Sequence, residues 1–215
     1  MGFWDYIVLL SYLLPLTMGL ALWFQKRLPF VSKVLWAYLL FTVCVEIAGA
    51  ILASNGSNNL WLSRVYVYAE LVFPSFFFFN QFSEGRSRKQ LLTVLLLAAI
   101  LITLTNLFDD WQTSASLQTG ITFGYVAFII ISYFVQMFRT EKVFNPFKDI
   151  YFVVGAVILL AHSGTLIYDV LYDYVITGVF GEEIHPILNG VNLGLILFYN
   201  ILYSYALWIS RLRLI

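Results

Sequence analysis

Charged residues, cysteine and histidine are all scarce in this sequence, and each scarcity excludes a class of protein. Only 11% of the 215 residues are charged and 61% are apolar, whereas soluble domains average about 25% charged and about 45–50% apolar residues. Because so few charges cannot cover a water-facing surface, we expect most of the exterior to face lipid. The lone cysteine, Cys44, lies in an apolar run and excludes an internal disulfide. The apolar segments leave no stretch within these 215 residues for a separate soluble domain of about 50 residues or more.

Motifs for catalysis and for nucleotide binding are lacking as well. The sequence contains no Walker or dinucleotide-binding motif and no G-x-S-x-G elbow. His162 is the one histidine inside an apolar segment, so the multi-histidine site of seven-helix membrane hydrolases is missing. A mixed metal site would need Glu46, Glu70 and Asp169 beside it and is a weaker alternative. We therefore expect no cofactor, no metal and no nucleic-acid partner, and we rank an intramembrane hydrolase last among the functions considered.

Seven apolar segments are long enough to cross a bilayer as helices, which takes roughly 20 residues each. Runs such as VLLLAAILITL do not alternate as the strands of a membrane barrel would. The first segment is followed, not preceded, by basic residues, which is the reverse of a cleaved signal peptide. We predict an all-α fold, a single seven-transmembrane-helix bundle over residues 1–215. Its spans are residues 6–24, 34–53, 60–80, 91–108, 115–138, 151–176 and 186–210.

The basic residues predict how the spans are oriented. Eleven of the twelve Lys and Arg residues lie beside the odd-numbered connections or in the C-terminal tail, whereas the even-numbered connections carry asparagine and acidic residues. Since cytoplasmic loops are enriched in Lys and Arg, we expect the N-terminus outside and the C-terminus in the cytoplasm, in the plasma (inner) membrane. Tryptophans at both ends of the spans agree with this layout. The eleven are Lys26, Arg27, Lys33, Arg86, Arg88, Lys89, Arg139, Lys142, Lys148, Arg211 and Arg213.

Two weaker patterns concern internal organisation. The segments RLPFVSKVLWAYLL and KVFNPFKDIYFVVG both place a proline after a basic residue, then an aromatic residue, a lysine and an apolar run. They suggest a repeat of two three-helix units around the fourth span, a 3+1+3 arrangement. The pairs Gly120/Gly124 and Gly190/Gly194 are G-x-x-x-G motifs, which predict close packing between helices.

Polar and ionisable residues inside the spans are the candidate functional residues, because burying them in lipid is costly. Spans two, three, five, six and seven each carry a polar stripe at helical spacing, whereas spans one and four have almost none, so span four is expected to face lipid. Most of these residues lie in the outer half of the predicted bundle and suggest a pocket that opens outward. The alternative is that they only hydrogen-bond one another across helices. The predicted ligand-binding residues are Glu46, Arg64, Tyr66, Glu70, His162, Asp169, Asn189 and Asn192.

The motif NNLWL before the third span, the segment FNPFKDIYFVVG and the closing FYNILYSYALW resemble a group of uncharacterised seven-helix membrane proteins of Bacteroidota. In that group a glutamate recurs in the second span, here Glu46, and another in the third span, here Glu70. Its members are often encoded near sensor histidine kinases, so the resemblance implies a role in signalling.

These patterns favour a receptor- or sensor-like membrane protein. A small-molecule or lipid ligand would enter the outward pocket, and a cytoplasmic or membrane protein partner would receive the signal, since the chain has no output domain. The alternatives are a small solute transporter and a non-catalytic accessory subunit of a larger membrane complex. A transporter is disfavoured by the apolar inner half, where Phe76 to Phe79 are expected to fill the end of the third span.

Overall fold

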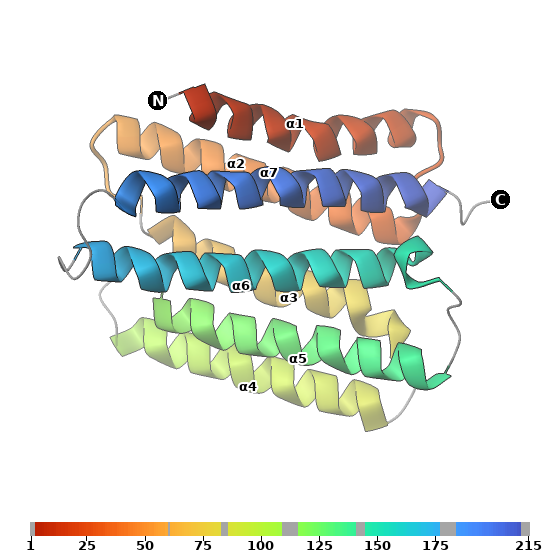
Figure 1. The fold of residues 1–215 in the computed structure, drawn as a ribbon. Coiled ribbons are helices and arrows are strands. Elements are labelled where there is room, and N and C mark those ends of the chain that lie inside the picture. The colour runs from red at the N-terminus through yellow and green to blue at the C-terminus, as the bar shows by residue number, and fades with distance from the viewer. Residues whose placement is uncertain are drawn as a thin grey trace. The chain divides into compact units, whose positions relative to one another are not determined.

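The computed structural model describes residues 3–59, 61–82, 86–108, 116–140, 145–176 and 184–211, and these form helices joined by short turns, without a strand (Figure 1). Each predicted span coincides with one α-helix, and the largest boundary difference is five residues, at the start of α4. Six of the helices are long and apolar enough to cross a membrane, as in a multi-pass membrane protein; in the seventh, α1, the stretch so identified is the shorter Leu10–Phe24. The helices are α1 (Phe3–Phe24), α2 (Phe30–Ser54), α3 (Trp61–Phe78), α4 (Arg86–Phe108), α5 (Ser116–Thr140), α6 (Ile150–Ile176) and α7 (Ile184–Ser210), with short 3₁₀ turns η1 (Phe79–Gln81) and η2 (Pro146–Lys148).

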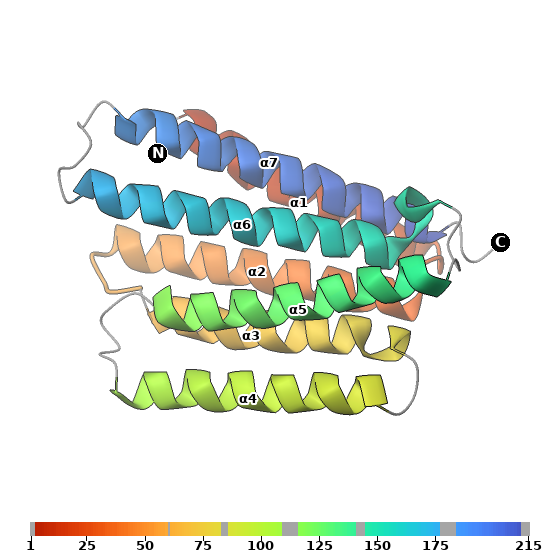
Figure 2. The ribbon, with the colours of Figure 1, turned by 60° about the horizontal axis from the view of Figure 1, so that its bottom comes forward.

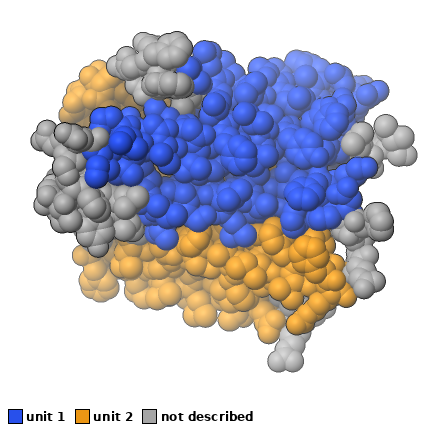
Figure 3. Space-filling model, viewed as in Figure 1, with its two compact units in different colours: residues 1–32, 145–215 blue, residues 33–144 orange. Residues whose placement is uncertain are grey.

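The chain forms two compact units (Figure 3). Unit 1 comprises residues 1–32 and 145–215, in which α7 packs against both α1 and α6. Unit 2 comprises residues 33–144, in which α3, α4 and α5 pack against one another, and α2 joins them through Tyr38, whose ring stacks on Phe73 with centroids 4.1 Å apart. Figure 2 shows α6 beside α7 within unit 1. The units group the first helix with the last two, so they do not follow the three-helix blocks of the 3+1+3 pattern.

Helices α1 and α2 end in the same hydrogen-bonded motif, but with different residues at its critical position. In α1, Arg27 N donates to Leu22 O (3.0 Å) and Lys26 N to Trp23 O (2.9 Å), with Lys26 at φ 56°. The motif at the end of α2 has the same two bonds and places Gly56 at φ 67°. This left-handed conformation suits glycine, whereas a side chain is strained there. Lys26 is therefore a residue that local backbone energetics disfavour.

We expect Lys26→Gly to stabilise the chain by about 0.5–1 kcal/mol, because relief of the left-handed strain outweighs the greater freedom of glycine in the unfolded chain. The reverse change, Gly56→Lys, should destabilise it by a similar amount. Thermal unfolding of the purified chain in a neutral detergent measures both. A lower melting temperature for Lys26→Gly would show that the lysine side chain contributes more to the fold than its backbone strain removes.

Close helix packing occurs at a glycine outside the two G-x-x-x-G pairs. A Cβ atom added at Gly164 of α6 would lie 2.5 Å from the Tyr199 hydroxyl and 3.0 Å from Leu195 Cδ1, both on α7. The Tyr199 hydroxyl also donates to the Leu160 carbonyl (3.4 Å). By contrast, a Cβ added at any of the four glycines of the G-x-x-x-G pairs meets no atom of another helix within 4 Å among the described residues. The prediction that those pairs mediate close packing is therefore wrong for the described residues.

Gly164→Ala should cost about 1–2 kcal/mol, because the added methyl displaces the Tyr199 hydroxyl in a packed interface. Tyr199→Phe removes the displaced oxygen, so the double variant should unfold close to Tyr199→Phe alone. The matched control is Gly194→Ala on α7, which has open space and should be neutral or stabilising. Equal destabilisation by Gly164→Ala in the presence and absence of Tyr199→Phe would contradict this packing.

The core of unit 2 is aromatic at the end where α3 terminates. Phe77 and Phe78 of α3 are buried, their rings are 5.1 Å apart, and Phe78 lies 5.4 Å from Tyr133 of α5. Phe76 is exposed, so Phe77 and Phe78 are the buried members of the block Phe76 to Phe79 that was expected to fill this end of the span. A further side-chain bond joins α3 to α5, between the hydroxyls of Ser75 and Tyr125. These side chains fill the core at that end of unit 2.

Candidate functional site

A buried arginine is held by amide side chains where α3 begins, α4 ends and α5 begins, which we call the Trp61 end of unit 2. Arg64 Nη1 donates to Asn106 Oδ1 at 2.6 Å, and Gln118 Nε2 donates to the same oxygen at 3.2 Å. Asn106 Nδ2 in turn donates to the Tyr68 hydroxyl at 3.0 Å, which lies 3.4 Å from Thr103 Oγ1. We call these five side chains the Arg64 network. It connects three helices by hydrogen bonds that meet at one amide.

Helical spacing explains why these side chains converge. Arg64 and Tyr68 are four residues apart on α3, and Thr103 and Asn106 are three apart on α4, so each pair shares one helix face. Arg64 is the fourth residue of α3 and so lies roughly 5 Å along the helix axis from its first residue. The network is consequently near the ends of the helices.

Burial makes the network energetically demanding. Arg64 is 1% exposed and Asn106 is 7% exposed. A charged group removed from water is strongly unfavourable unless hydrogen bonds replace its hydration. Asn106 Oδ1 supplies one such replacement, and its 2.6 Å contact is short, as charge-assisted hydrogen bonds are.

The same face of α5 carries a buried hydroxyl beyond the network. Thr122 lies one helical turn after Gln118 and is fully buried. Its Oγ1 makes no hydrogen bond with any of the residues that the structure describes. Buried polar atoms are nearly always hydrogen-bonded, so a group without a partner calls for an explanation such as a bound water or a ligand.

A second set of polar side chains surrounds Glu70, near the middle of α3. The Tyr38 and Tyr66 hydroxyls are 3.1 Å apart, and Tyr66 also hydrogen-bonds the Glu70 side chain. Glu70 is buried, and two of the predicted site residues, Tyr66 and Glu70, are thus hydrogen-bonded to each other within unit 2. Arg64 and Glu70 are six residues apart and hence on different faces of α3.

Glu46 does not join this set. Its side chain is exposed on α2 and has no hydrogen-bond or ion-pair partner among the described residues. It lies well inside an apolar helix that is long enough to span a membrane. A carboxylate at that depth is costly if it faces lipid.

The other predicted site residues belong to unit 1. His162 on α6 and Asn192 on α7 are half-buried, and Asn189 on α7 is exposed. Asp169 lies on α6, but its side chain is outside the described residues. The predicted set is thus divided between the two units, and within unit 2 it includes the hydrogen-bonded Tyr66 and Glu70.

Helices α1 and α4, which were expected to have almost no polar residues facing other helices, each form an interhelical hydrogen bond. Helix α4 supplies Asn106 to the centre of the Arg64 network. Helix α1 supplies Ser11, whose Oγ accepts from Asn200 Nδ2 of α7 at 2.8 Å, with both residues buried. The sequence signal was present in each case, namely a polar residue, Asn106 or Ser11, within a run that is otherwise mostly apolar. Helix α4 still has the broad exposed apolar face expected of a lipid-facing helix, formed by Leu92, Leu96, Leu97, Ile100, Leu101, Leu104, Leu107 and Phe108.

Comparison with known proteins adds nothing to this description. No protein-family model, curated protein or solved structure matches the chain.

Proposed function

We propose that the chain is a receptor- or sensor-like, seven-span protein of the plasma membrane that binds a small polar ligand at the Trp61 end of unit 2. The observation that carries this proposal is the fully buried Thr122 hydroxyl, without a hydrogen-bond partner among the described residues, one turn from the Arg64 network. A hydrogen-bonding ligand, a small molecule or the polar part of a lipid, would satisfy this hydroxyl and compete with the Asn106 oxygen for the Arg64 guanidinium. The resemblance to proteins encoded near sensor kinases supports the same class of function.

The basic residues of unit 2 indicate which end of its helices faces outward. In unit 2 the described basic residues other than Arg64 lie at the opposite end of the helices, with Lys33 near the start of α2, Lys89 near the start of α4 and Arg139 at the end of α5. Because Lys and Arg favour the cytoplasmic side, the Trp61 end faces outward. The N-terminus is then outside and the C-terminus in the cytoplasm, so ligand arrives from outside.

Ligand binding can act on the cytoplasmic side because the Arg64 network joins three long helices. A ligand that replaces the bonds of Asn106 favours a packing of α3, α4 and α5 different from the unliganded one, and its differential affinity for the two packings sets the size of the response. A cytoplasmic or membrane partner reads the change. The aromatic side chains at the other end of unit 2 disfavour a solute path through this unit and hence a transporter.

A thermal-shift screen of the purified chain with soluble carboxylates, amino acids and phosphate esters tests the proposal. At least one compound should raise the melting temperature of the unaltered chain, with a greatly reduced shift in Thr122→Val. This variant has the same shape without the hydroxyl and should itself be as stable as the original chain or more stable. The matched control is Thr105→Val on α4, whose hydroxyl bonds the Ile102 carbonyl. Ligand shifts that are equal in Thr122→Val and Thr105→Val would contradict binding at this position.

The exposed Glu46 favours a second candidate, a non-catalytic subunit of a larger membrane complex. A partner helix that carries a cation or a hydrogen-bond donor would satisfy this carboxylate within the membrane. Purification in a mild detergent should then recover one stoichiometric partner, and Glu46→Gln should weaken its retention, with Cys44→Ser on the same helix as the control. Recovery of the same partner in equal amount with Glu46→Gln would contradict this role of Glu46.

A further inference from the structure

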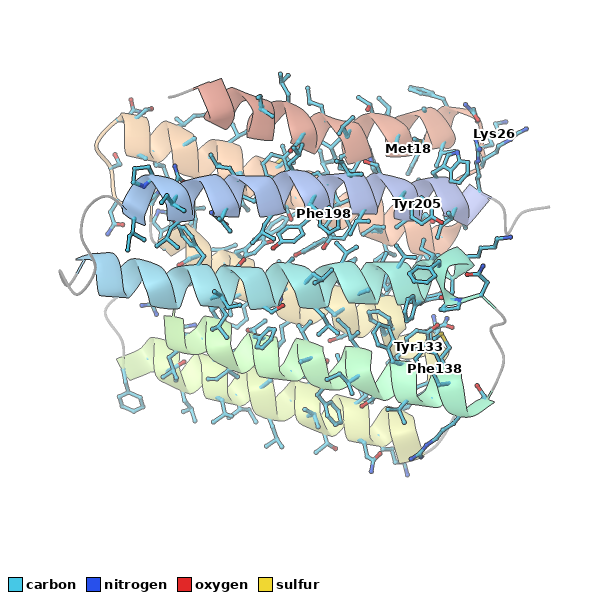
Figure 4. The ribbon with its side chains drawn as sticks, viewed as in Figure 1. Met18, Lys26, Tyr133, Phe138, Phe198 and Tyr205 are labelled. Carbon is cyan, nitrogen blue, oxygen red and sulfur yellow. The ribbon has the colours of Figure 1, made fainter. Side chains whose placement is uncertain are left out.

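One end of unit 1 combines four basic residues with exposed aromatic rings. Lys26 and Arg27 follow α1, Lys148 ends the turn η2, and Arg211 follows α7. Figure 4 shows Lys26 and Tyr205 at the same end of this unit. The Tyr205 hydroxyl donates to the Phe147 carbonyl at 3.1 Å and thereby attaches the Lys148 turn to the last turns of α7. We call Lys26, Arg27, Lys148 and Arg211 the basic rim.

The aromatic side chains beside the basic rim have the composition of a membrane interface. Phe24 is 77% exposed, Phe147 is 66% exposed, and Trp23 and Trp208 are also exposed. Tryptophan and basic residues gather where acyl chains meet headgroups. The Arg211 guanidinium lies over the Trp208 ring, 4.6 Å from its centroid, so a cation is held at this level.

Little negative charge opposes the basic rim. The acidic residue described at this end of unit 1 is Asp149, which is buried. Its Oδ1 accepts from the backbone N–H groups of Tyr151 (2.8 Å) and Phe152 (3.0 Å) and so caps α6. Its carboxylate is thus committed to the start of that helix, and the four cations are available to an external anion.

The backbone at Lys26 provides an independent observation. This lysine has a left-handed conformation, whereas the equivalent position of α2 has glycine in the same motif. A strained residue retained where glycine fits better points to a role for its side chain. The role that the surroundings indicate is to place a positive charge at the membrane surface.

We propose that the basic rim of unit 1 binds the phosphodiester headgroup of an anionic phospholipid. Lys26 and Arg211 supply charge and hydrogen-bond donors to the phosphate oxygens, while the exposed rings lie among the upper acyl chains. The site is separate from the ligand site of unit 2 and does not depend on it.

Native mass spectrometry of the full chain in a neutral detergent tests this inference, with phosphatidylglycerol and phosphatidylcholine of identical acyl chains as probes. The chain should bind phosphatidylglycerol more tightly. Lys26→Gly should weaken that binding about fivefold, the effect of roughly one interfacial charge, and leave phosphatidylcholine binding unchanged. Because the same variant should melt at a higher temperature, weaker lipid binding could not be attributed to misfolding.

Two controls make the result decisive. Lys89→Gln removes one exposed basic residue from unit 2 and should leave phosphatidylglycerol binding close to that of the unaltered chain. Inorganic phosphate at the same concentration as the lipid should not compete. Equal weakening by Lys26→Gly and Lys89→Gln, or efficient competition by inorganic phosphate, would overturn the proposal in favour of a general charge effect or a soluble-anion site.

Discussion

Replacing Asn106 by leucine should destabilise the chain by about 3 kcal/mol, because the change removes a short hydrogen bond from a buried guanidinium. Asn106 Oδ1 receives hydrogen bonds from Arg64 and Gln118, and its Nδ2 donates to Tyr68, so one substitution removes three bonds. Leucine also leaves no polar atom that could take over this position. Unfolding in mixed micelles with an increasing fraction of sodium dodecyl sulfate measures the loss.

A double-variant cycle separates the network from a general packing defect. Arg64→Met removes the buried charge, so Arg64→Met combined with Asn106→Leu should be less destabilising than the sum of the two single changes. Asn106→Asp, which keeps an acceptor for Arg64, should cost much less than Asn106→Leu. A loss below about 0.5 kcal/mol for Asn106→Leu, the range of ordinary surface changes, would show that the network contributes little.

Phe78→Ala should cost about 3–4 kcal/mol through the cavity it leaves in the aromatic core of unit 2. Phe78 is 0% exposed and lies between Phe77 and Tyr133. The matched control is Phe76→Ala, two residues away on the same helix and 56% exposed, which should cost less than about 1 kcal/mol because no enclosed cavity forms. Equal losses for the two variants, measured by the same micellar unfolding, would mean that these faces of α3 are not buried and exposed as described.

The helices could be predicted from the sequence because apolar length alone determines them. Each span needs only a run of apolar residues long enough for the bilayer, and the seven runs correspond to seven helices within five residues at every boundary. Which helices pack together could not be predicted as well, because every span is apolar on most sides and its periodicity does not identify its neighbours. The packing of α1 against α7, in one unit with α6, was therefore not foreseen.

Only part of the candidate site could be predicted, for a related reason. Ionisable residues are conspicuous in apolar runs, so Arg64 and Glu70 were identified, but the neutral Asn106 at the centre of the Arg64 network was not. Asn106 lies close to the end of α4 and shares its helix face with Thr103, a pattern too short to stand out as a polar stripe. The G-x-x-x-G pairs show the opposite error, since a motif suited to close packing lies in open space while the isolated Gly164 makes the close approach.

The outward position of the Arg64 network depends on the orientation of the chain in the membrane. Labelling of single cysteines in intact cells with a membrane-impermeant maleimide tests it most directly, in a Cys44→Ser background that removes the natural thiol. Ser57→Cys, in the exposed turn between α2 and α3, should react in intact cells. Thr140→Cys, exposed at the end of α5, should react only after permeabilisation. Labelling of Thr140→Cys but not Ser57→Cys in intact cells would place the network on the cytoplasmic side and contradict the proposed orientation.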